Sequence, residues 1–143
     1  MPSCTFFGHR DCQEDIRSRL RQVIGELIVE RGVDMFYVGD QGSFDAIVRS
    51  ELRRMEQEHP HIRYAVVLAY LPGKDRGDGP CPDTMLPEGI EHVHPRYAIS
   101  WRNDWMLRRA DFVVAYTTRP WGGAYQWTEK ARRRGKTVID IGR

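Results

Sequence analysis

The sequence has few cysteines and no long apolar run. Its 143 residues include three cysteines, Cys4, Cys12 and Cys81, an odd number without a Cys-x-x-Cys pair. This pattern is typical of a reducing cytosol rather than of a disulfide framework. No apolar run approaches the roughly 18 residues that a membrane span requires, and the N-terminus lacks the layout of a signal peptide. We therefore expect a soluble, cytoplasmic protein with no membrane partner.

An excess of one charge is also nearly absent. Twenty-two Lys and Arg against 20 Asp and Glu leave a formal net charge of +2. So small an excess does not by itself argue for a polyanion, and nucleic acid is not an expected partner. The basic run "KARRRGK" (130–136) is interpreted as an exposed helix face, where cations near the C-terminus are favoured by the helix dipole. The ordinary apolar fraction of 41% predicts one folded domain over 1–143.

Short apolar runs alternate with longer amphipathic ones along the chain. Apolar runs predict strands at 4–7, 35–39, 64–71, 112–117 and 137–141. Helical spacing predicts four intervening helices: one from an Asp11 N-cap to a Gly32 C-cap, one over 44–55, one over 97–110 and one over 122–134. Residues 72–95 are expected to be mostly loop, with a short strand considered at 90–93. The alternation predicts an α/β fold, a Rossmann-like three-layer αβα sandwich with a mainly parallel five-stranded sheet.

Three predicted strand-to-helix turns carry unusual residues: "GHRD" (8–11), "GDQGSFD" (39–45) and "RPWGG" (119–123). In an open parallel sheet such turns lie at the carboxyl edge, where ligands bind. Each precedes a helix N-terminus, whose free N–H groups favour anions, and glycine allows a phosphate to approach them. The alternative is that glycine serves only to reverse the chain. The P-loop and GxGxxG patterns are absent, so a site built from several turns is the hypothesis.

Four short motifs occur in a fixed order: "GHR" after the first strand, "VGDQGSFD" at the second, "RNDWMLRRAD" before the fourth and "GGAYQWTEKA" after it. Together they resemble the SLOG superfamily of Rossmann-like domains, which includes lonely-guy phosphoribohydrolases, DprA/Smf DNA-processing proteins and YpsA-like proteins. The resemblance covers nearly the whole chain and is strongest to the YpsA-like branch. It implies a nucleotide or nucleotide-derived ligand and a homodimer.

The resemblance to lonely-guy enzymes also implies a catalytic pair. Arg102 and Met106 match their RxxxM motif, while Gly122, Gly123 and Glu129 match PGGxGTxxE, although the residues between differ. Hydrolysis of an N-glycosidic bond builds positive charge on the sugar, which the carboxylate of Glu129 would stabilise. Arg102 would bind phosphate or orient that carboxylate. The alternatives are an exposed Glu129 paired with a neighbouring arginine and a surface Arg102.

The remaining candidates for ligand binding lie on or beside the three turns. They are Gly8, His9, Arg10, Gly39, Asp40, Gly42, Ser43, Asp45, Asn103, Thr117, Arg119, Trp121, Gly122 and Gly123. Asp40 and Asp45 would bind ribose hydroxyls, His9 would donate to a phosphate, and Trp121 would stack on a base.

No cofactor is expected, and no metal, because Cys81, His92 and His94 match no standard ligand spacing. Two rival functions stay open: a non-catalytic sensor of a nucleotide-derived ligand, and a DprA-like DNA-associated protein.

Overall fold

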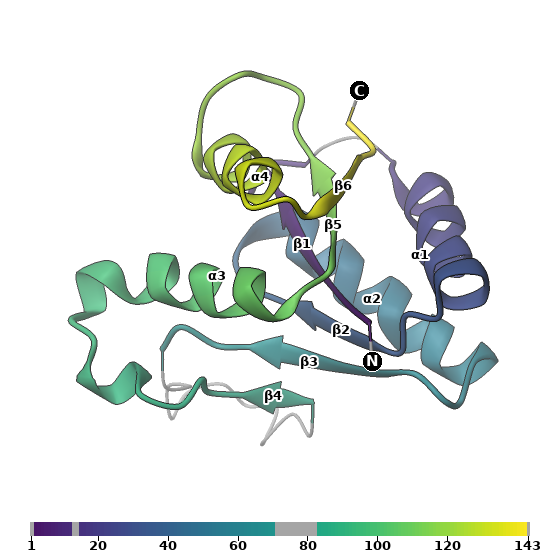
Figure 1. The fold of residues 1–143 in the computed structure, drawn as a ribbon, viewed down its shortest axis with the longest axis horizontal. Helices are drawn as coiled ribbons and strands as arrows, with labels where there is room; N and C mark the ends of the chain where they lie inside the picture. The colour runs from purple at the N-terminus through teal and green to yellow at the C-terminus, as the bar shows by residue number, and fades with distance from the viewer. Residues whose placement is uncertain (1, 13–14, 71–82, 143) are drawn as a thin grey trace.

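The computed structural model describes residues 2–12, 15–70 and 83–142 (Figure 1). Its elements follow in the order β1 (Ser3–Gly8), α1 (Arg17–Arg31), β2 (Met35–Val38), α2 (Gly42–Glu58), β3 (Arg63–Val67), β4 (Thr84–Met85), α3 (Ala98–Arg109), β5 (Phe112–Tyr116), α4 (Gly123–Arg133) and β6 (Thr137–Asp140). Two short 3₁₀ turns, Ile90–His92 and Pro95–Tyr97, precede α3. No helix in these described ranges is long and apolar enough to cross a bilayer.

The strands form one sheet in the order β4-β3-β2-β1-β5-β6, and every pairing is parallel. The predicted α/β sandwich is therefore confirmed. The predicted strand count is wrong, because the described residues form a sheet of six strands rather than five. The additional strand, β4, has two residues and lies in the stretch expected to be loop. The strand considered at 90–93 is also wrong, since Ile90–His92 forms a 3₁₀ turn.

Helices cover both faces of the sheet, α1 and α2 on one side and α3 and α4 on the other (Figure 1). Successive residues of a strand point to opposite faces, and Phe6 and Phe7 of β1 illustrate this alternation. Phe6 belongs to the core beneath α1 and α2, whereas Phe7 belongs to the smaller core beneath α3 and α4. The two cores pack against the central strand β1 from both sides. This strand therefore supports the first turn, residues 8–11, which follows it.

The N-terminus of α1 lies later than predicted. The helix begins at Arg17 with Ile16 at its N-cap, so Asp11 is not the capping residue. The carboxylate of Asp11 instead accepts two hydrogen bonds from Arg119, each 3.2 Å long. The predicted C-terminus is confirmed, because Gly32 adopts the left-handed conformation with φ 69° and its N–H bonds to Leu27.

The sheet has a switch point between β1 and β5. From β1 the chain proceeds outward through β2 and β3 to β4, and it then returns to add β5 and β6 on the other side of β1. Connections therefore diverge to opposite faces at the carboxyl ends of these two strands. In open α/β sheets this is where ligands bind.

Candidate functional site

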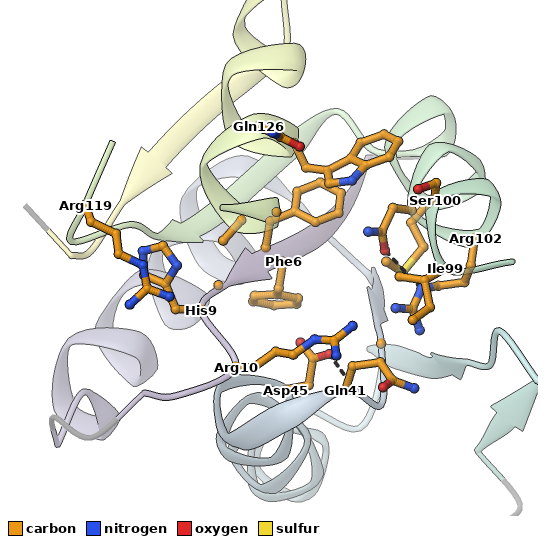
Figure 2. A pocket seen from close by; sticks show the side chains of 18 residues that line it. Phe6, His9, Arg10, Gln41, Asp45, Ile99, Ser100, Arg102, Arg119 and Gln126 are labelled. Atoms are coloured by element: carbon orange, nitrogen blue, oxygen red, sulfur yellow. Dashed lines mark hydrogen bonds between the residues drawn. The ribbon is translucent and has the colours of Figure 1, made fainter. Parts of the chain in front are cut away.

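A pocket of about 360 Å³ opens at this switch point. Figure 2 shows His9 and Arg119 on one side of it and Ile99, Ser100 and Arg102 of α3 on the opposite side. Gln126 of α4 lies on a third side, facing a group formed by Arg10, Gln41 and Asp45. The volume is within the range of roughly 300–1,000 Å³ typical of small-molecule sites.

The pocket brings together many of the candidate residues from all three turns. Those that line it are Gly8, His9, Arg10, Gly39, Asp45, Arg102, Asn103, Arg119 and Gly123. The convergence of the turns, which the sequence could only suggest, is therefore present in the structure. Whether these residues bind a ligand stays a prediction.

Other candidates do not line the pocket: Asp40, Gly42, Ser43, Thr117, Trp121, Gly122 and Glu129. The carboxylate of Glu129 accepts a hydrogen bond from Arg132 one turn further along α4, which is the alternative considered from the sequence. Trp121 has 63% of its surface exposed and lies 6.0 Å from the guanidinium of Arg119. Thr117 is buried and donates its hydroxyl to Asp140, so it ties β5 to β6.

Sequence reasoning did not assign several residues that line the pocket. They are Phe6, Phe7, Gln41, Ile99, Ser100, Met106, Ala124, Gln126 and Trp127. Gln41 lies within the second turn, so the argument from the turns applied to it as much as to its neighbours. The others come from β1, α3 and α4, where the face that meets the cavity depends on packing. Phe6, Phe7 and Trp127 give the pocket an apolar, aromatic wall, with the rings of Phe7 and Trp127 stacked 5.9 Å apart.

A buried cluster of charges forms the α3 side of the pocket. The guanidinium of Arg102 donates from Nη1 to the carbonyl of Val67 at 3.0 Å and to Asp40 at 3.4 Å. Its Nε donates to Asn103 at 3.0 Å. The side chains of Arg102 and Asp40 are only 3% and 8% exposed. Arg102 is therefore an internal residue, and its interpretation as a surface arginine is wrong.

Asp45, on the first turn of α2, is the second carboxylate near Arg102. Its Oδ2 accepts a hydrogen bond of 2.9 Å from the backbone N–H of Gln41. Burial raises the pKa of Asp45 from 3.8 to about 6, against the opposing effects of that hydrogen bond and of Arg102. Gly39 is required beside this pair, because a Cβ there would lie 2.9 Å from both Arg102 Nη1 and Asp45 Oδ2.

We expect Asp45→Asn to raise the free energy of unfolding at pH 7.5 by about 1–3 kcal/mol. The pKa in the folded protein, about 6, exceeds the value of 3.8 for an exposed carboxyl, so ionisation opposes folding. This destabilisation is absent below pH 3.8, grows between pH 3.8 and about 6, and is constant at higher pH. Urea unfolding from pH 3.5 to 8 measures the difference between variant and wild type. A difference that does not change with pH would contradict the assignment.

His9 and Arg119 form the opposite side. His9 is 4% exposed, and its Nε2 accepts a hydrogen bond of 3.1 Å from the backbone N–H of Thr118. Burial, and then the charge of Arg119, lower the pKa of His9 below 6.5, so the imidazole is neutral at pH 7 and carries its proton on Nδ1. Within the described residues, Nε of Arg119 is buried without a hydrogen-bond partner.

The second turn, residues 39–45, is hydrogen-bonded to the first, residues 8–11. The hydroxyl of Ser43 donates to the carbonyl of Arg10 at 2.7 Å, and the N–H of Ser43 bonds to the same oxygen at 2.8 Å. Gly42 has φ +88°, and a Cβ there would lie 2.6 Å from Cα of Arg10. Gly42 and Ser43 therefore position Arg10 at the pocket without lining it.

The glycine pair at 122–123 begins α4. Gly122 is its N-cap and has φ +95°, which other residues rarely adopt, while Gly123 has ordinary backbone angles. A Cβ on Gly123 would meet no atom within 4 Å. Gly122 is thus required by the backbone conformation, whereas Gly123 leaves open space where α4 meets the pocket. No side chain caps this helix, so its first N–H groups are available to an anion.

These features define a Rossmann-like α/β sandwich with a polar pocket at its switch point. No protein-family model matches the chain, and no curated protein matches it. Among solved structures, the chain is similar to DNA processing protein A (DprA) from Streptococcus pneumoniae, with a TM-score of 0.69 and 13% sequence identity. The match covers 97% of this chain and 50% of the other, so this chain spans about half of that protein.

At this identity the likeness shows the fold alone. It confirms that the chain has a DprA-like fold, which is the coarser part of the resemblance noted from the sequence. The relation to YpsA-like and lonely-guy proteins stays a prediction.

Proposed function

We propose that the pocket binds a nucleotide or nucleotide-derived ligand through its phosphate. The observation that carries this proposal is the convergence of Arg10, Arg119 and the N-terminus of α4 on one cavity. Two guanidinium groups and free helix amides are the groups that bind phosphate in proteins. The adjoining aromatic wall suits the apolar face of a base or sugar.

The proposal concerns binding first and hydrolysis second. Glu129, the carboxylate expected to stabilise the reacting sugar, pairs with Arg132 and does not line the pocket. This placement favours a sensor over a phosphoribohydrolase. Hydrolysis of the N-glycosidic bond stays a prediction, and release of free base from AMP or GMP would establish it. Loss of that turnover in Glu129→Gln, with binding retained, would assign it to this carboxylate.

Arg119→Ala and Arg10→Ala are each expected to weaken binding of AMP, GMP or ADP-ribose by about tenfold or more, because a charge-assisted hydrogen bond contributes roughly 1.5–3 kcal/mol. Isothermal titration calorimetry measures the affinities. The matched control is Arg54→Ala, which removes the same charge from a residue of α2 that is 56% exposed and pairs with Glu58. Equal affinities in all three variants, or no binding by the wild type, would contradict the proposal.

A second candidate function is association with DNA, which the likeness to the fold of a DNA processing protein favours. The exposed arginines at 132–134, near the C-terminus of α4, would contact the backbone phosphates. A gel shift with single- and double-stranded DNA at 50 and 200 mM salt tests this candidate. Salt-sensitive binding that is lost on replacing these arginines with alanine, and not on replacing Arg119, would favour it over the pocket.

A further inference from the structure

The two sides of the pocket offer a ligand different groups. Arg119 lies beside His9 on one side, next to the first turn of α4. On the other side, the carboxylates of Asp40 and Asp45 face two guanidinium groups, those of Arg102 and Arg10. An anion therefore meets Arg119 and the uncapped amides of α4 at the first side, whereas at the second it meets the carboxylate of Asp45 in the pocket wall.

Asp45 has an acceptor that the protein leaves unused. Only 9% of its surface is exposed, and it lines the pocket. Its Oδ2 accepts the N–H of Gln41, whereas Oδ1 has no hydrogen-bond partner among the described residues. Within the described residues Oδ1 is not one of the fully buried atoms that lack a partner, so it is accessible from the pocket, and a ligand there can donate a hydrogen bond to it.

From this geometry we infer that Asp45 is a specificity-determining residue, which accepts a hydrogen bond from a hydroxyl of the ligand and repels a second phosphate group. The inference rests on the proposed function and narrows its ligand class. A sugar monophosphate would place its phosphate beside Arg119 and α4 and a hydroxyl at Asp45. A diphosphate of similar length would bring negative charge to a buried carboxylate.

The protonation state of Asp45 controls this selection. The charged groups that face its carboxyl are Arg102 of α3, Asp40 of the second turn and Arg10 of the first. With its pKa raised to about 6 by burial, the carboxyl is ionised at pH 7.5 and mostly neutral at pH 5. The neutral form donates a hydrogen bond and carries no charge, so it admits a second phosphate.

The test compares ribose 5-phosphate with inorganic pyrophosphate by calorimetry at pH 7.5 and pH 5. At pH 7.5 we expect the wild type to prefer ribose 5-phosphate and Asp45→Asn to bind pyrophosphate about tenfold more tightly than the wild type does, the change that corresponds to roughly 1.4 kcal/mol. When the pH is lowered from 7.5 to 5, the ratio of the affinities for pyrophosphate and ribose 5-phosphate should rise. The rise should be larger in the wild type than in Asp45→Asn. The variant corrects for titration of the phosphates and of His9, which affects both proteins.

Glu58→Gln is the matched control, since it removes a carboxylate from the same helix at a residue that is 53% exposed and pairs with Arg54. Its preferences should equal those of the wild type. If Asp45→Asn does not fold, Asp45→Ser removes the same carboxylate. If both probes bind, and Asp45→Asn does not change the ratio of their affinities, the inference is overturned and the proposed function stands. Binding of neither probe by the wild type overturns both.

Discussion

Arg102→Met is expected to lower the free energy of unfolding at pH 7.5 by about 3–5 kcal/mol, because it removes one partner of a buried ion pair. Asp40 is almost fully buried, and its carboxylate lies 3.4 Å from Arg102 Nη1. Asp45 also loses one of the two positive charges, those of Arg102 and Arg10, that oppose its protonation. The carbonyl of Val67 and the side chain of Asn103 lose donors as well. Urea denaturation followed by circular dichroism measures the change.

Two comparisons isolate the buried charge as the cause. Arg108→Met removes an arginine from the same helix, but that residue is 57% exposed and pairs with Asp104, so we expect a loss below about 1 kcal/mol. Asp45→Asn should raise the free energy of unfolding more in the Arg102→Met background than in the wild type, since Asp45 has then lost the charge of Arg102. A loss in Arg102→Met as small as that in Arg108→Met would contradict the assignment of Arg102 to the interior.

The fold followed from the sequence wherever an element has its own apolar pattern. The strands β1, β2, β3, β5 and β6 coincide with apolar runs. For the inner strands β1, β2, β3 and β5 this is expected, because both faces of an inner parallel strand are covered and no alternating pattern is needed. Strand β4 has only two residues, Thr84 and Met85, which pair with Val66 and Val67 at the edge of the sheet. So short a segment has no periodicity, and only the neighbouring β3 determines its conformation.

The start of α1 shows how a local signal can be overridden by a distant residue. Asp11 and Glu14 have the spacing of a capping box, but the carboxylate of Asp11 binds Arg119, which is 108 positions away in the sequence. Both hydrogen bonds of this pair are 3.2 Å long, and they direct the carboxylate toward Arg119. Arg10 and Asp11 form a turn, α1 begins only at Arg17, and Glu14 lies outside the described residues.

The residues of the site that lie on the strand-to-helix turns could be predicted, because the topology of the sheet places these turns. Residues within helices could not, because their place depends on the direction of the side chain. The carboxyl ends of parallel strands meet at one edge, which brought His9, Asp45 and Arg119 together. Glu129 follows Gly123 by six residues, a rise of about 9 Å along α4, which carries it away from the pocket at the N-terminus of that helix. Motif spacing fixes this distance, but only the packing of α4 on the sheet shows which residues reach the cavity.

Gly8→Ala is expected to lower the free energy of unfolding by about 3 kcal/mol, at the upper end of the usual cost of overpacking a core. A Cβ at this position would lie 2.3 Å from the ring of Phe44. That ring cannot retreat easily, because Phe44 is fully buried and stacks on Tyr116 at 5.9 Å. Gly8 also lines the pocket, so any ring displacement reaches the first turn and should weaken ligand binding as well. Thermal and urea unfolding, with calorimetry for binding, measure both effects.

Gly25→Ala provides the matched control, since it adds the same methyl group with the opposite expected result. Gly25 lies inside α1, and its Cβ would lie 3.7 Å from Cε of Met55, an ordinary contact. Replacing a glycine within a helix by alanine stabilises by roughly 0.5–1 kcal/mol, because the unfolded chain loses conformational freedom. Opposite signs for the two variants would show that Gly8 is retained for the close approach of Phe44. Equal effects would mean that the β1 end can shift to accommodate a side chain, and the first turn would then be a less rigid support for His9 and Arg10 than their contacts indicate.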